Sequence, residues 1–137
     1  MNGRAFALAE AAEALVGARF RLHGRDPRTG LDCIGVLATA MAGIGRPVAV
    51  PNGYALRLAD LAAFRPLAAR FGFAEAVGDI LPGDVLMFAV GPVQFHLAVA
   101  ARDGLLVHAH AGLRRVVLGP AGADWRPAGH WRLLEQD

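Results

Sequence analysis

A single cysteine and three histidines are the side chains of this sequence that could together activate a nucleophile. Cys33 directly follows Asp32, whose short carboxylate is a good helix N-cap, so we expect Cys33 in the first turn of an apolar helix. Unpaired backbone N–H groups and the positive end of the helix dipole stabilise a thiolate there. We therefore expect the pKa of Cys33 to be lowered, although a free cysteine is also commonly a small buried hydrophobe.

The histidines are predicted to meet on one strand pair. A three-residue loop at Arg102–Gly104, built around an Asp-Gly turn signal, would pair the strands on either side of it. This register sets His96 directly opposite His110 and makes His108 a diagonal neighbour. Because side chains alternate along a strand, all three histidines would then share one face of the sheet. A slip of one residue would send His96 to the other face.

Two chemistries fit a cysteine with convergent histidines. The first is a thiolate nucleophile with His96 as the general base and a further polar group orienting its imidazole. The second is a mononuclear zinc site that uses Cys33 with two or three histidines. We favour nucleophilic catalysis, because His108 and His110 form the only close pair in the sequence and Cys33 lies far upstream.

The elements that must position these residues change character halfway along the chain. The first half predicts helices at residues 6–16, at Asp32 to Gly43–Gly45 and at Leu56–Phe71, the last broken or restarted by Pro66. A polar loop, Arg19–Leu31, precedes the second helix. The second half has short apolar runs separated by Gly, Pro or Asp-Gly, which predict an antiparallel meander of four to six strands. Helices followed by strands indicate an α+β fold, and 137 residues indicate a single domain over 1–137.

Composition excludes several function classes. The chain has no serine, so every serine-nucleophile mechanism is excluded, and its single cysteine excludes an intrachain disulfide. The net charge is only +2 without any basic stripe, so we expect no nucleic-acid partner. Glu10 and Glu13 interrupt the apolar N-terminal stretch, and the long uncharged runs are too short or are broken. We therefore expect neither a signal peptide nor membrane insertion, and synthesis in the cytoplasm.

Four short motifs, in order, resemble the NlpC/p60 family of papain-like cysteine peptidases, which hydrolyse peptide bonds in bacterial peptidoglycan. Asp32-Cys33-Ile34-Gly35 resembles the family's Asp-Cys-Ser-Gly, and Leu81-Pro82-Gly83-Asp84 resembles the Pro-Gly-Asp strand before the catalytic histidine. Phe95-His96-Leu97-Ala98-Val99 resembles the His-Val-Gly-Ile-Tyr strand. Val107-His108-Ala109 resembles the family's Ile-His-Ala, whose histidine orients the base. The resemblance spans roughly residues 15–117.

The sequence departs from the family pattern at three positions. Phe20 stands near the place of a tyrosine whose hydroxyl helps to form the family's active site, and Ile34 replaces the usual serine. Ala98 replaces the usual glycine. The stretch from Gly24 through Asp26 to Cys33 resembles most the branch found in phage tails and gene transfer agents, which implies a peptidase carried on a particle.

The resemblance implies a papain-like α+β fold, with the nucleophile helix packed on an antiparallel sheet of about five strands. It implies Cys33 as nucleophile, His96 as base and His108 as the orienting residue, without a cofactor or metal. Further residues are expected to line the substrate cleft; they are Phe20, His23, Asp32 and His110. The implied substrate is a peptidoglycan stem peptide, cut between D-glutamate and diaminopimelate, with phage-like tail proteins as partners and the periplasmic cell wall as place of action.

Three alternatives belong to other classes: an inactive tail component that keeps the fold, a zinc-binding module, and an acyltransferase with a papain-like core. The order Cys33, His96, His108 argues against those lipid acyltransferases that place the histidines before the cysteine.

Overall fold

The fold combines helices with one antiparallel sheet, as predicted. The computed structural model describes residues 3–50, 61–91 and 94–135, and the side chains of residues 61–63 lie outside that description. The helices in these ranges are α1 (Gly3–Glu13), α2 (Cys33–Gly43) and α3 (Leu61–Arg70). The predicted start of the third helix, at Leu56, lies outside the described residues. No helix of the described chain is both long and apolar enough to cross a membrane.

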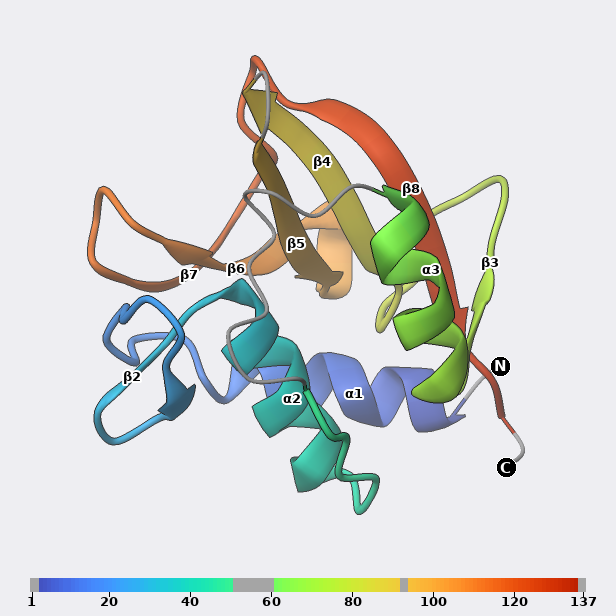
Figure 1. Ribbon diagram of the computed structural model, residues 1–137, viewed down its shortest axis with the longest axis horizontal. Helices are drawn as coiled ribbons and strands as arrows, with labels where there is room; N and C mark the ends of the chain where they lie inside the picture. Colours follow the sequence, from blue (N-terminus) through green and yellow to red (C-terminus); the bar gives the residue numbers. More distant parts are fainter. Residues whose placement is uncertain (1–2, 51–60, 92–93, 136–137) are drawn as a thin grey trace.

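Six strands form the main sheet, in the order β3-β8-β4-β5-β6-β7, and every neighbouring pair is antiparallel. Their bounds are β3 Phe73–Glu75, β4 Val85–Gly91, β5 Gln94–Ala100, β6 Leu106–His110, β7 Arg115–Gly119 and β8 Arg126–Leu133. Strands β4 to β7 follow one another as the predicted meander (Figure 1). The meander prediction is wrong for β8, which returns to pair with β4. Two short strands, β1 (Arg25–Asp26) and β2 (Gly30–Leu31), pair within the loop before α2.

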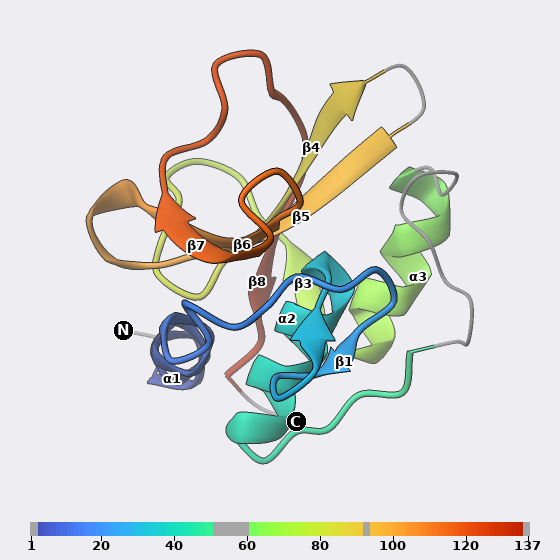
Figure 2. The same ribbon diagram turned by 90° about the vertical axis from the view of Figure 1, so that its left-hand side faces the viewer.

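The two faces of the sheet carry separate apolar clusters, because successive side chains of a strand point in opposite directions. The larger cluster joins the sheet to the helices, which gather on one side of it in Figure 2, and includes Met87 and Val107. The smaller cluster lies on the opposite face. Its members are Leu86, Phe88, Ala98, Ala100 and Leu106, with Val90 and Trp125 packed against them.

Two helices differ in detail from the prediction. In α1 the buried residues are Ala5, Leu8, Ala9 and Ala12. Phe6, which the periodicity placed with the apolar positions, is 47% exposed, because it lies off the stripe that faces α2 and the sheet. Pro66 does not break α3, although it removes one backbone donor. The helix continues because Phe64, Leu67, Ala68 and Phe71, spaced i, i+3, i+4 and i+7, are buried on the core.

The hairpin between β5 and β6 has the predicted register. A three-residue turn, Arg102–Gly104, holds Asp103 and Gly104 at positive φ and pairs Val99 with Val107. The ladder is shorter than predicted, because it includes only that pair and Ala100 with Leu106. Beyond it, toward Gln94, the two strands are no longer paired within the described residues.

Asp84 fastens the end of β8 to the turn before β4. Its fully buried carboxylate accepts hydrogen bonds from the backbone N–H of Leu81 (2.9 Å) and from Nε of Arg132 (2.8 Å). Nε2 of His130 lies 2.6 Å from the same carboxylate. Burial alone would raise the pKa of Asp84, but these hydrogen bonds outweigh burial and the pKa is lowered. The backbone N–H of Asp84 donates to the carbonyl of Leu81 at 3.0 Å and closes the turn, so the carboxylate joins this turn to His130 and Arg132.

Gly35 lets the start of α2 lie directly against the preceding loop. A Cβ at this position would lie 2.1 Å from the carbonyl oxygen of Gly24. We expect Gly35→Ala to lower the free energy of unfolding by about 1–3 kcal/mol, because backbone atoms must move to relieve the overlap. Gly43→Ala, in the same helix, is the matched control, since its Cβ would meet Ala11 at an ordinary 3.6 Å. Urea unfolding measures both, and equal stabilities would contradict this packing.

Candidate active site

Cys33 occupies the first position of α2, and the sequence before it fixes the start of that helix. Asp32 has extended backbone angles, and its Oδ1 accepts a hydrogen bond from the N–H of Gly35 at 2.8 Å. Oδ1 also binds Nη1 of Arg25 (2.7 Å), while Oδ2 accepts from the N–H of His23 (2.9 Å). The predicted N-cap is thus confirmed. Asp32 ties the loop before α2 to the helix start, so both of its oxygens already have protein partners.

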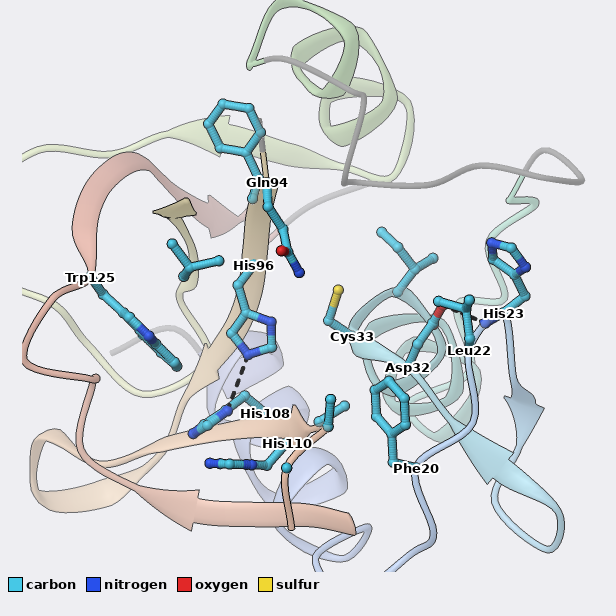
Figure 3. A pocket seen from close by; sticks show the side chains of 16 residues that line it. Phe20, Leu22, His23, Asp32, Cys33, Gln94, His96, His108, His110 and Trp125 are labelled. Atoms are coloured by element: carbon cyan, nitrogen blue, oxygen red, sulfur yellow. Dashed lines mark hydrogen bonds between the residues drawn. The ribbon is translucent and has the colours of Figure 1, made fainter. Parts of the chain in front are cut away.

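His96 and His108 are in hydrogen-bond contact. Nε2 of His96 lies 3.1 Å from Nδ1 of His108, and the two rings meet edge to face with centroids 5.1 Å apart. His108 is only 4% exposed. In Figure 3 the other ring nitrogen of His96 lies on the side of Cys33. The structure therefore brings together the two histidines that the motifs paired.

His110 is close to this pair but does not join it by a hydrogen bond. Its Nδ1 accepts from the backbone N–H of Leu113 at 3.0 Å, and its ring centroid lies 5.9 Å from that of His108. The hairpin register continued from Val99 and Val107 sets His110 opposite His96, as predicted. Yet the imidazole contact is the diagonal one, because β5 and β6 separate before they reach the histidines.

The separation of β5 and β6 opens a cavity of about 500 Å³, into which α2 places its first residues. Cys33, His96 and His108 line it, together with the four residues expected in the cleft: Phe20, His23, Asp32 and His110. The ring of Phe20 is half-buried and offers no hydrogen-bonding atom. His23 is exposed and has a positive φ of 61°. Their roles in substrate binding stay predictions.

Burial determines the charge of the free site. It raises the pKa of Cys33 to about 12, although the backbone N–H of Leu97 opposes it, and the Asp32 charge raises it further. Burial also lowers the pKa of His96 to about 4, reinforced by His108 and His110, and lowers that of His108 to about 4. The expected lowering of the Cys33 pKa is therefore wrong for the free protein, since desolvation outweighs the helix N–H groups. At pH 7 the thiol of Cys33 and the imidazoles of His96 and His108 are therefore neutral.

A neutral site restricts the tautomers that can do chemistry. For Nδ1 of His96 to accept the thiol proton, the ring must carry its own proton on Nε2 and donate it to Nδ1 of His108. His108 must then carry its proton on Nε2. The contact at 3.1 Å fits this arrangement and turns the basic nitrogen of His96 toward the cysteine.

Several residues of the cavity wall were not predicted from the sequence, and two of them, Trp125 and Gln94, carry polar groups. Trp125 lines the cavity beside His96 and His108. Nothing near it in the sequence indicates this, because only the return of β8 to β4 brings it there. Gln94 also lines the cavity, and Figure 3 shows its amide directed inward. Its position two residues before His96, on the same strand face, was a usable signal.

The part of the chain that the structure describes contains no set of ligands for the zinc site considered above. In that part, no three His, Cys, Asp or Glu side chains are grouped so as to hold a metal ion.

Comparison with known proteins supports the fold. No family model and no curated protein match the sequence. Among solved structures, the NlpC/p60 domain of the peptidoglycan hydrolase SagA is 21% identical with a TM-score of 0.64, over 92% of this chain and 96% of that one. NlpC1 from Trichomonas vaginalis is 18% identical with a TM-score of 0.68, over 93% of this chain.

The peptidoglycan hydrolase RipB from Mycobacterium tuberculosis is 18% identical with a TM-score of 0.64, over 97% of this chain and 66% of that one. The present chain spans only 43% of the NlpC1 chain. At such identities the likeness concerns the fold. The chain has the α+β fold of NlpC/p60 papain-like domains.

Burial of the histidine pair makes stability depend on pH. Because the pKa values of His96 and His108 are lowered to about 4, the unfolded chain binds more protons between about pH 6.5 and pH 4. We expect the free energy of unfolding to fall by about 3 kcal/mol as the pH drops from 6.5 to 5, with about half of the loss from each histidine. Urea titrations at both values measure it. In the double variant His96→Gln/His108→Gln the free energy of unfolding should fall less over the same pH interval. An equal fall would show that the histidine pair does not cause the pH dependence.

Proposed function

We propose that this chain is a cysteine endopeptidase that cleaves stem peptides of peptidoglycan. The observation that carries the proposal is the contact between His96 and His108, in the same cavity as the thiol at the start of α2. A nucleophile, a base and a residue that orients the base are the parts that covalent peptide hydrolysis requires.

In the proposed reaction, Sγ of Cys33 attacks the scissile carbonyl carbon while Nδ1 of His96 takes the thiol proton. Because the free thiol is neutral, this proton moves during the attack rather than before it. The oxyanion of the tetrahedral intermediate is stabilised by the backbone N–H of Cys33 at the helix start. The C–N bond then breaks, and His96 returns the proton to the leaving amine.

The resulting thioester is hydrolysed by water with the same base. His96 removes a proton from the water as its oxygen attacks the thioester carbonyl, and the C–S bond breaks. The proton passes to the sulfur, so the thiol and the neutral imidazole are restored. Throughout, His108 holds the Nε2 proton of His96 in place and stabilises the imidazolium that forms transiently.

The finer assignments come from the sequence resemblance. We propose the bond between D-glutamate and diaminopimelate as the cleavage site, and a phage-like or gene-transfer-agent tail as the carrier that brings the enzyme to the periplasmic cell wall. In the loop that carries the motif resembling this branch, Arg25 binds the capping carboxylate of Asp32, next to Cys33. Asp26 binds Arg28 across a short exposed turn of the same loop.

Digestion of purified peptidoglycan, with product masses determined by mass spectrometry, tests the proposal. Wild-type protein should release fragments cut within the stem peptide, and Cys33→Ala should release none. Wild-type activity that survives in Cys33→Ala would show another nucleophile. A folded wild type that leaves peptidoglycan uncut would favour the structural tail component.

The same assay separates the two neighbouring histidines. We expect His108→Ala to lower kcat at least about 100-fold, because an imidazole without its partner loses its tautomer and orientation. His110→Ala is the matched control on the same strand face and should cost less than about tenfold, as for a residue of the cavity wall. A greater loss in His110→Ala would mean that the orienting role belongs to His110.

A further inference from the structure

One aromatic side chain outside the proposed catalytic residues touches both imidazoles. The indole of Trp125 lies with its centroid 5.0 Å from the ring of His96 and 5.1 Å from that of His108, at interplanar angles of 68° and 78°. It also packs against Phe88 at 5.2 Å. Edge-to-face contacts at these separations are the favourable geometry for aromatic rings (Figure 3).

These contacts place the histidine pair between two apolar walls. Phe88 is the register partner of His96 on β4 and is only 7% exposed, so β4 closes one side. Trp125, from the connection between β7 and β8, covers the pair on the face opposite α2. The open side is the cavity that contains Cys33.

Contacts within its own loop fix the position of the Trp125 side chain. The N–H of Trp125 donates to the carbonyl of Gly122 at 3.1 Å, which folds the connection back on itself. The indole lies over this glycine, since a Cβ at position 122 would be 2.5 Å from Nε1 of Trp125. Only a glycine leaves room there for the ring.

We propose that Trp125 is a positioning residue that holds the His96–His108 pair in its hydrogen-bonded geometry and excludes water from it. The catalytic consequence rests on the peptidase function proposed above. The packing of the pair does not, because it follows from ring contacts alone. Through this packing, Nδ1 of His96 is kept directed at the thiol and the imidazoles stay neutral.

Few titratable side chains lie near the His96–His108 pair. The other titratable side chains of the cavity are Cys33 at the start of α2, His23 and Asp32 in the loop before it, and His110 on β6. The carboxylate of Asp32 is already held by Arg25. On β4 the facing side chain is Phe88. Removing the indole therefore changes hydration more than charge. Water reaching the imidazoles favours their protonated forms, so their titration moves to higher pH.

Four variants test the proposal. Trp125→Ala removes the indole, Trp125→Phe keeps a ring, and Gly122→Ala displaces the indole without removing it. Gly119→Ala is the matched control, because a Cβ there meets no atom within 4 Å. Each is examined for thermal unfolding, for kcat and KM on peptidoglycan fragments, and for histidine titration by NMR, which needs no substrate.

Trp125→Ala should lower kcat at least about tenfold while KM changes less than about threefold, because orientation rather than binding is lost. Its His96 and His108 titrations should move up by at least about half a pH unit, as should the acid limb of kcat/KM. Gly122→Ala should show smaller changes of the same sign, Trp125→Phe should recover most of kcat, and Gly119→Ala should match wild type.

A folded Trp125→Ala or Gly122→Ala variant with unchanged titrations would overturn the proposal, as would a lower thermal stability without any change in kcat or in the acid limb. If wild-type protein cuts no peptidoglycan, the peptidase proposal fails, and the NMR titrations alone still decide whether Trp125 keeps the pair dry. If Trp125→Ala does not fold, the NMR titration of Gly122→Ala, which retains the indole, decides the question instead.

Discussion

The contact between Nε2 of His96 and Nδ1 of His108 determines which nitrogen is free to act on the cysteine. Its 3.1 Å separation uses one nitrogen of His96 and leaves the other on the side of Cys33. His108 is buried and His96 is half-buried, and burial lowers the pKa of both rings, so each is neutral near pH 7 and the proton between them has a defined place. The reaction proposed above therefore starts from a neutral thiol and a neutral imidazole.

Three other features of the fold place residues around this contact. The separation of β5 from β6 makes room for the first turn of α2, and Asp32 fixes where that turn begins. The return of β8 to pair with β4 carries Trp125 onto the far side of the imidazoles. Strand pairing thus positions His96, helix capping positions Cys33, and the connection between β7 and β8 places Trp125 against the histidine pair.

Local signals predicted much of this arrangement. The N-cap at Asp32, the hairpin at Asp103 and the α+β class depend on neighbouring residues, so the sequence contains them directly. The path of β8 and the position of Trp125 depend on contacts between distant segments, which periodicity does not encode. The lowered pKa expected for Cys33 was wrong for the same reason, because the helix start is local while the desolvation of the sulfur comes from the packed strands.

¹⁵N NMR of the free protein at pH 7 shows which nitrogen of the His96 ring carries its proton. We expect a neutral His96 with its proton on Nε2 and an unprotonated Nδ1, and the same tautomer for His108. A His96 that carries its proton on Nδ1 would contradict the proposed direction of proton transfer. A doubly protonated His96 would show that a thiolate–imidazolium pair forms before substrate binds, against the neutral site described above.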